Sequence, residues 1–222
     1  MNNIIIKNTL DEEEENYLKS CLFSTLNHFA VSEEKAEEIY DRLYCEYSDW
    51  NRPYHNLSHI LSLLNLREKY VDKIKKIHQF DLAIWFHDAI YDAKKKDNEV
   101  QSAELFIEFM RPFLTKEDLV FIKSLILSTI NHIPLLPDDS DHLYFLDFDL
   151  AVLSAERATY KLYAEAIKEE YRSIFSFLIY TNGRKKVLES FRQRKTIYFS
   201  QIFQENYELE ARKNLAWEIE HS

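Results

Sequence analysis

The chain has 222 residues, of which 46% are hydrophobic and 14% aromatic, and its formal net charge is -10. This composition excludes intrinsic disorder, and the length suits one large domain that buries roughly 70% of the surface of its unfolded chain. Glycine occurs once, at Gly183, which excludes a phosphate-binding P-loop, a dinucleotide-binding fingerprint and a nucleophile elbow, because each of these needs several glycines.

The charge and the cysteines also limit the partners and the compartment. A strongly negative chain opposes a phosphate backbone, so we expect no nucleic-acid partner. Two cysteines, Cys21 and Cys45, are too few for a disulfide framework or a zinc clamp. The apolar run Ile4-Ile5-Ile6 is too short for a signal peptide or a membrane-spanning segment. We therefore expect a soluble, cytoplasmic protein without a membrane partner.

The first two helices are predicted by their capping residues. Thr9-x-x-Glu12 has the pattern of a capping box, and Ser32, followed by two glutamates, marks the start of a second helix. Apolar residues recur at helical spacing after both signals, so we interpret both helices as scaffold.

The segment after Pro53 carries two histidines one helical turn apart. Tyr54-His55-Asn56-Leu57-Ser58-His59 runs directly into the apolar stretch Ile60-Leu61-Ser62-Leu63-Leu64. Residues four apart lie on one face of a helix, so His55 and His59 can both face the same cavity. A capped helix whose histidines bond only to their neighbours is the alternative interpretation.

An adjacent histidine and aspartate, His87-Asp88, end an apolar helix predicted over residues 74–91. An imidazole and a carboxylate in a buried wall suit a divalent cation, since each offers one lone pair and together they carry one negative charge. A charged loop with Lys94-Lys95-Lys96 comes next, and a further helix is predicted from Asn98 to just before Pro112.

A central helix is predicted from the capping signal at Thr115 to about Ile130, and it brings His132 close to its C-terminal end. Residues 131–141, which include two prolines, form the longest predicted loop.

Two carboxylates, Asp147 and Asp149, lie inside the apolar run of the next predicted helix. Carboxylates in such a setting are costly unless they bind a cation or accept good hydrogen bonds. A calcium-binding loop does not explain them, because the required turn glycine is missing.

The C-terminal third is predicted to be helical as well. Ser154 caps a long helix that Gly183 ends, Arg184-Lys185-Lys186 begins another, and residues 187–220 contain two further amphipathic stretches. The sequence has no apparent repeat, linker or domain boundary. We therefore predict a single all-α domain over residues 1–222, a bundle of roughly nine to eleven helices.

Three predicted helices thus bring a histidine or a carboxylate into an apolar setting. Their order, His55/His59, then His87-Asp88, then Asp147/Asp149, resembles that of the HD superfamily of metal-dependent phosphohydrolases. The element from Tyr54 to His59 is similar to the YHNxxH element of cyclic-nucleotide phosphodiesterases. His87-Asp88-x-x-x-Asp92 partly resembles the HDxxED element of alarmone hydrolases, with Tyr91 in place of the glutamate.

More closely, the chain resembles a bacterial group of uncharacterised predicted HD phosphohydrolases of about this length. The matching pieces lie between residue 52 and about residue 195: YHNLSHI, WFHDAIYD, NEVQSA, Thr129-x-x-His132, FLDFDLAVL, and EEY followed by Gly183-Arg184. The resemblance implies a helical bundle of the HD/phosphodiesterase type with a metal site, and it leaves the substrate undefined.

The resemblance implies four ligands for one or two divalent ions (Mn, Fe, Zn, Mg, Ni or Co), at distances of about 2.0–2.3 Å. These are His59, His87, Asp88 and Asp149. Asp149 is preferred to Asp147 because Phe148-Asp149-Leu150 is similar to the Ala-Asp-Leu element of the family. Asp88 is the ligand suited to bridge to a second ion.

The predicted activity is hydrolysis of a phosphoester of a small metabolite or nucleotide by metal-activated water. The resemblance makes His55 the general acid for the leaving oxygen, and Asp92, one turn after Asp88, could orient the attacking water. Lys94, His132 and Arg184 are candidate phosphate partners, although a solvated loop also explains the lysine run.

Two alternatives stay open. An HD-fold di-iron oxygenase needs two additional histidines between the His-Asp pair and the last aspartate, where only His132 and His142 lie. A ligand-binding or structural helical domain with a residual metal site is the other alternative. The presence of His55 argues against it, because a purely structural metal site needs no general acid.

Overall fold

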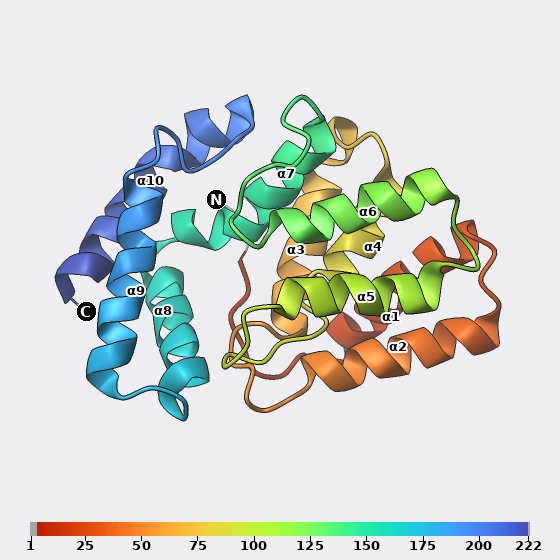
Figure 1. The fold of residues 1–222 in the computed structure, drawn as a ribbon, viewed down its shortest axis with the longest axis horizontal. Helices are drawn as coiled ribbons and strands as arrows, with labels where there is room; N and C mark the ends of the chain where they lie inside the picture. Colours follow the sequence, from red (N-terminus) through yellow and green to blue (C-terminus); the bar gives the residue numbers. More distant parts are fainter. Residues whose placement is uncertain (1–3, 222) are drawn as a thin grey trace.

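The computed structural model describes residues 4–221, and the regular secondary structure of this part of the chain is entirely helical (Figure 1). This part contains no strand, and its ten α-helices confirm the predicted all-α class and helix number. The prediction of one domain over residues 1–222 includes residues 1–3 and 222, which lie outside the described residues. The helices are α1 (Glu12–His28), α2 (Glu33–Tyr47), α3 (Leu57–Lys69), α4 (Ile77–Phe86), α5 (Asn98–Met110), α6 (Lys116–Ser128), α7 (Ser140–Asp149), α8 (Arg157–Arg172), α9 (Phe177–Arg192) and α10 (Gln201–His221), with the short 3-10 helices η1 (Val71–Lys73) and η2 (Leu150–Ser154).

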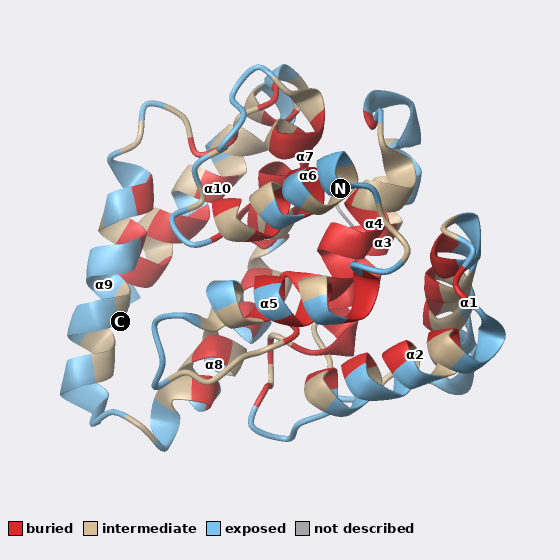
Figure 2. Ribbon diagram, turned by 45° about the vertical axis from the view of Figure 1, so that its right-hand side comes forward, coloured by how far each residue is buried: buried red, intermediate tan, exposed pale blue. Residues whose placement is uncertain are grey.

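The central helix is α4, which packs against α1, α3, α5, α6 and α7. Every residue from Phe80 to Phe86 is buried, so this helix has no solvent-facing side over its last two turns. Figure 2 shows the same concentration of buried residues on α3 and α4. The helices around residues 60, 85, 125 and 150 therefore pack together, and α4 contacts α3, α6 and α7.

The helices α8, α9 and α10 form a second group, on the left of Figure 1, and pack against one another and against η2. One continuous hydrophobic core includes residues of both groups. The helix α9 buries only Leu188 and Phe191 and is exposed over much of its length (Figure 2). Within the described residues, no helix has the length and apolarity needed to cross a membrane.

The start of α1 corrects one capping prediction. The capping box is formed by Asp11 and Glu14, not by Thr9 and Glu12: the Asp11 carboxylate accepts from the Glu14 N–H at 3.0 Å, and the Glu14 carboxylate accepts from the Asp11 N–H at 3.0 Å. Thr9 and Glu12 have the same three-residue spacing as Asp11 and Glu14, so the local sequence pattern does not distinguish the two possible capping boxes. The predicted starts at Ser32 and Thr115 are confirmed.

The helix predicted over residues 74–91 is shorter, and neighbouring elements set both its ends. The Asp141 carboxylate of α7 accepts the N–H groups of the two residues that precede α4, each at 2.9 Å. After the helix, the guanidinium group of Arg52 donates to the carbonyl oxygens of Asp88 and Ala89. His87 and Asp88 consequently lie in the turn that follows α4, not within the helix.

The prediction that a helix runs from Ser154 to Gly183 is wrong. Ser154 ends η2, and α8 begins at Arg157 and ends at Arg172. Gly183 lies inside α9, with no positive φ. A glycine in a helix interior costs only about 1 kcal/mol relative to alanine, so the helix continues through Gly183 without a break.

Candidate metal centre

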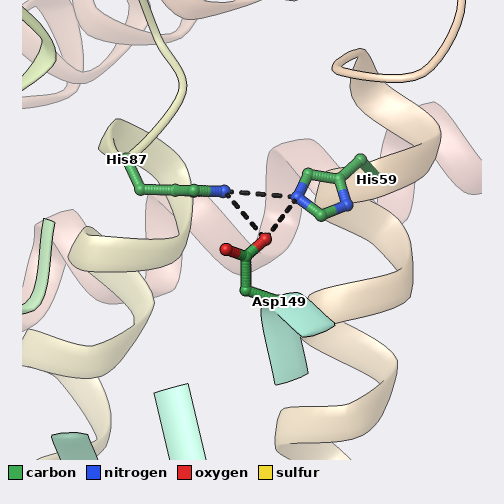
Figure 3. A group of neighbouring side chains, drawn as sticks. All are labelled: His59, His87 and Asp149. Carbon is green, nitrogen blue, oxygen red and sulfur yellow. Dashed lines mark hydrogen bonds and ion pairs between the residues drawn. The ribbon is translucent and has the colours of Figure 1, made fainter. Parts of the chain in front are cut away.

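His59, His87 and Asp149 converge from three elements (Figure 3). The Nε2 atoms of the two histidines lie 3.2 Å apart. The Asp149 Oδ1 atom lies 3.3 Å from Nε2 of His59 and 3.8 Å from Nε2 of His87. His59 is 4% exposed and His87 1%, so the three groups meet in an almost dry environment.

The first turn of α3 positions His59. Asn56 is the N-cap of this helix: its side-chain oxygen accepts from the Ser58 N–H at 2.8 Å, and its amide group donates to the carbonyl oxygens of Arg52 and Pro53. These bonds fix the direction in which the chain enters α3. The His59 side chain therefore points into the interior one turn after His55.

A backbone bond selects the tautomer of His87. Its Nδ1 atom lies 2.9 Å from the carbonyl oxygen of Ile84, which can only accept, so Nδ1 carries the proton. The Nε2 atom that faces His59 and Asp149 is then the nitrogen with the lone pair. A ring N–H bound to a backbone carbonyl is the usual arrangement of a metal-binding histidine.

Asp88 completes the cluster from the turn that follows α4. Its Oδ2 atom lies 3.1 Å from Nε2 of His87 and 3.9 Å from Nε2 of His59. The bond from the Arg52 guanidinium to the Asp88 carbonyl oxygen holds the backbone of this turn. Of the four residues predicted as ligands, the structure thus brings His59, His87 and Asp149 into one group that could hold a metal ion, and Asp88 lies beside this group.

The donor set fits a divalent cation. Ligand atoms about 2.1 Å from a common centre, at tetrahedral or octahedral angles, lie about 3.0–3.4 Å apart. Three of the separations found here, 3.1, 3.2 and 3.3 Å, fall in this range, and the other two, 3.8 and 3.9 Å, are longer. Burial alone lowers the pKa of His87, but the Asp88 and Asp149 carboxylates outweigh it and raise this pKa to about 9. The cluster therefore binds positive charge strongly. A divalent ion can supply this charge in place of the proton.

The two carboxylates of α7 have different roles. Asp147 is fully buried and accepts the N–H groups of Phe199 at 2.7 Å and Ser200 at 2.8 Å, just before α10 begins. Its role is to join α7 to the start of α10. Asp149, at the C-terminal end of α7, faces the histidines, as the prediction that preferred it requires.

His132 bonds to the ligand Asp149. Its backbone has φ 48°, in the left-handed region that few residues other than glycine adopt. The N–H of Ile133 reaches the carbonyl oxygen of Ser128, and the N–H of His132 that of Thr129, the two bonds of a Schellman motif that ends α6. In this conformation the His132 Nε2 atom lies 3.0 Å from Asp149 Oδ2.

His55 lies beside the cluster and is bound to Glu170 of α8. The His55 Nδ1 atom is 2.7 Å from Glu170 Oε2, and the other carboxylate oxygen accepts the N–H groups of Tyr54 and His55, each at 2.8 Å. Burial lowers the pKa of His55, but the Glu170 carboxylate more than compensates and raises it above its ordinary value. The ring of Tyr91 stacks on His55 at 4.3 Å.

Sequence reasoning gave no role to Glu170. A signal is present in the sequence, because Tyr163, Ile167 and Glu170 recur at helical spacing and so lie on one face of the helix. A carboxylate on an apolar face needs a partner inside the molecule. The identity of that partner depended on how α8 packs against the segment that carries His55.

A cavity of about 550 Å³ opens from the cluster. It is lined by His55, Asp88, His132 and Asp149 at the end next to the cluster and by Arg184 on α9. Two predicted site residues do not reach it. Asp92 accepts the Lys94 N–H at 2.9 Å within their shared loop, and neither Asp92 nor Lys94 is among the lining residues.

His142 is not part of the centre. It is fully buried, with Nε2 2.9 Å from the Ser124 hydroxyl and Nδ1 3.3 Å from Asp139, so it joins α7 to α6. The di-iron alternative required two further histidines, and only His132 lies near the cluster.

Comparison of the chain with protein-family models, with curated proteins and with solved structures found no match.

Proposed function

We propose that this protein is a metal-dependent phosphohydrolase of the HD type that cleaves a phosphoester of a small molecule. The observation that carries the proposal is the combination of a ligand cluster and an adjacent ion pair in one cavity. His59, His87, Asp88 and Asp149 supply the ligands, and His55, paired with Glu170, lies next to them. These elements follow the chain order of the HD superfamily.

A divalent ion held by this cluster would polarise the phosphoryl group and make water a stronger nucleophile near neutral pH. The chain itself provides the setting. The cluster lies at the inner end of a cavity whose walls are largely apolar, so charges formed there are poorly screened by solvent. The His87 tautomer, fixed by the carbonyl oxygen of Ile84, keeps a lone pair directed at the cluster.

His55 is the group that can give a proton to the leaving oxygen. Its Nδ1 atom is bound to Glu170, so its Nε2 atom is the one that can serve the cavity. The raised pKa of His55, caused by Glu170 against the effect of burial, favours the protonated ring that a general acid requires. A site that only held a metal for structural reasons would have no use for this pair.

The test measures metal content and phosphate release on the purified protein and on two matched variants. Asp149→Asn and Asp147→Asn make the same change two positions apart in α7. We expect Asp149→Asn to lose most of its bound metal and its phosphate release, because it removes a charged ligand. Asp147→Asn should retain both at permissive temperature, because Asp147 bonds only to the backbone before α10. Equal metal content in all three proteins, or no phosphate release from any phosphoester with Mn²⁺, Fe²⁺, Zn²⁺, Mg²⁺, Ni²⁺ or Co²⁺, would contradict the proposal.

A further inference from the structure

The walls of the cavity beyond the ligand cluster are mostly aromatic and aliphatic, with Asn98 and Thr129 as uncharged polar members. They come mainly from α8, α9 and the segment around η2. The aromatic and aliphatic lining residues include Tyr163 and Ile167 on α8, Ile179, Val187 and Phe191 on α9, and Val152 in η2. A cavity of about 550 Å³ with such walls has the size and character of a site for a compact apolar group.

The cations of the lining are not available to a second anionic group. Arg184 is bound through two nitrogens to the Glu218 carboxylate, at 2.7 and 3.2 Å, and its side chain is only 10% exposed. Its guanidinium group also lies over the ring of Tyr163. Its charge is therefore already neutralised by Glu218. The candidate role of Arg184 as a phosphate partner would require this buried pair to break.

The remaining lysines lie in the exposed loop before α5. Lys95 and Lys96 both contribute to the lining and are both exposed, so an anion that meets them there stays hydrated. Glu99, also in the lining, adds a negative charge on the same side. The cavity thus accepts one anionic group at the ligand cluster and offers no buried cation for another.

From this distribution of charge we infer that the substrate is a single-phosphate ester of an uncharged, apolar or aromatic alcohol. This inference rests on the proposed phosphohydrolase activity and adds the class of substrate. The phosphate would lie at the cluster and the apolar group between α8 and α9. Sugar phosphates would be poor substrates, because their hydroxyl groups would lose bound water against the largely apolar walls. Esters that carry a second charge far from the phosphate would be poor substrates as well, because the cavity offers no buried cation for that charge.

The test compares esters that differ only in the alcohol. 2-Naphthylmethyl phosphate and glucose 6-phosphate are both esters of primary alcohols, so the acidity of the leaving group does not decide the result. We expect kcat/KM of the metal-loaded protein to be about 100-fold higher for the naphthyl ester, because its ring transfers apolar surface out of water. The naphthyl ester with a carboxylate on the distal ring should lose most of this advantage.

Two neighbouring residues of α9 provide a matched pair of variants. Ile179 lines the cavity and Leu178 does not, and both are largely exposed, at 60% and 70%, so a glutamate at either position leaves the core intact. Ile179→Glu should raise KM for the naphthyl ester by about tenfold with unchanged metal content. Leu178→Glu should have no effect. Val187→Lys, which adds a cation to the lining, should partly restore activity toward the carboxylated ester.

Naphthyl fluorescence separates this inference from the proposed activity. If the naphthyl ester binds the metal-loaded protein in preference to glucose 6-phosphate but is not hydrolysed, the inference about the cavity stands and the phosphohydrolase proposal fails. If glucose 6-phosphate is hydrolysed at least as efficiently, the phosphohydrolase proposal stands and the inference is overturned. Absence of naphthyl binding, or equal effects of Ile179→Glu and Leu178→Glu, also overturns it.

Discussion

At the scale of single residues, His55, which precedes the N-cap of α3, and His59, in the first turn of α3, have different surroundings. Burial lowers the pKa of His59, and its Nε2 atom faces other ligand atoms, whereas His55 is bound to Glu170 and lines the cavity. A neutral imidazole suits a metal ligand, and a protonated imidazole suits an acid. Under the proposed function, His59 would therefore serve as the ligand and His55 as the acid.

A His55→Ala variant should keep its metal but lose turnover by roughly 10²–10⁴-fold, the usual contribution of general acid–base catalysis. His87→Ala should lose both metal and activity, because it removes a buried ligand. Metal content and phosphate release are measured side by side on the two variants. Loss of metal from His55→Ala to the same extent would identify His55 as a ligand. As a control, an ester with a very acidic leaving group needs no proton and should largely rescue His55→Ala.

His132 combines an unfavourable backbone conformation with a bond to a ligand. Because glycine adopts a positive φ without strain, His132→Gly should relieve the backbone but remove the bond to Asp149. We expect metal affinity to fall by about 10–100-fold, as is usual when a partner of a ligand is removed. Titration with Zn²⁺ or Mn²⁺ measures this.

The control for His132→Gly is Ala30→Gly. Ala30 is the other residue with a positive φ among those described, at 55°, and it follows α1, far from the cluster in the sequence. Its replacement should raise the free energy of unfolding by about 1 kcal/mol and leave metal affinity unchanged. An unchanged affinity in His132→Gly would show that the bond to Asp149 does not support the metal site.

At the scale of helices, Asp147 joins α7 to α10. Burial raises its pKa to about 7, although the N–H groups of Phe199 and Ser200 oppose the shift. An aspartate in the unfolded chain has a pKa of about 3.9, so the folded state binds the proton more tightly. The stability that Asp147 contributes is therefore complete below about pH 4 and is lost as the pH rises toward 7.

We compare the free energies of unfolding of the wild-type protein and of Asp147→Asn. We predict that the difference, wild type minus variant, decreases by up to about 4 kcal/mol between pH 4 and pH 7 and then levels off. Asparagine does not titrate, and its amide group also places a donor against a backbone N–H, so the variant is less stable at low pH. Urea unfolding of both proteins across this range measures the difference. Parallel pH profiles would mean that Asp147 is ionised throughout.

At the scale of the whole molecule, the ligand cluster connects three helical segments that are distant in sequence. His59 begins α3, His87 and Asp88 follow α4, and Asp149 ends α7. Without a metal ion, the two carboxylates of Asp88 and Asp149 are balanced only by the proton that they favour on His87. A bound metal should therefore stabilise the fold as well as the site.

Removal of metal with a chelator should lower Tm by about 5–10 °C, since a ligand at 100 times its Kd contributes about 2.7 kcal/mol to a domain of this size. Scanning calorimetry with and without added Mn²⁺ or Zn²⁺ measures the shift. The His87→Ala variant serves as the control and should show no metal-dependent change in Tm. An unchanged Tm in the wild-type protein would indicate that the metal does not bind the folded chain at this cluster.

The sequence by itself determined the all-α class and most of the helices, and it predicted three residues that the structure brings together, His59, His87 and Asp149. Helical spacing and capping are local properties, and one-turn or adjacent placement limits which side chains can share a site. The sequence did not determine the end of α4, which depends on Arg52 and Asp141 from other elements. It also misplaced the break between α8 and α9, because a single helical glycine need not end a helix.

Only the tertiary structure decided which polar groups pair across the interior. It gave His55 its partner Glu170, 115 residues away, bound Asp147 to the start of α10 and neutralised Arg184 with Glu218. Each pairing depends on how two helices pack, and helical periodicity fixes the face of a helix but not its neighbour. These pairings decide which charges in the lining of the cavity are already neutralised. Our inference about the class of substrate therefore depends on the folded structure and could not be made from the sequence.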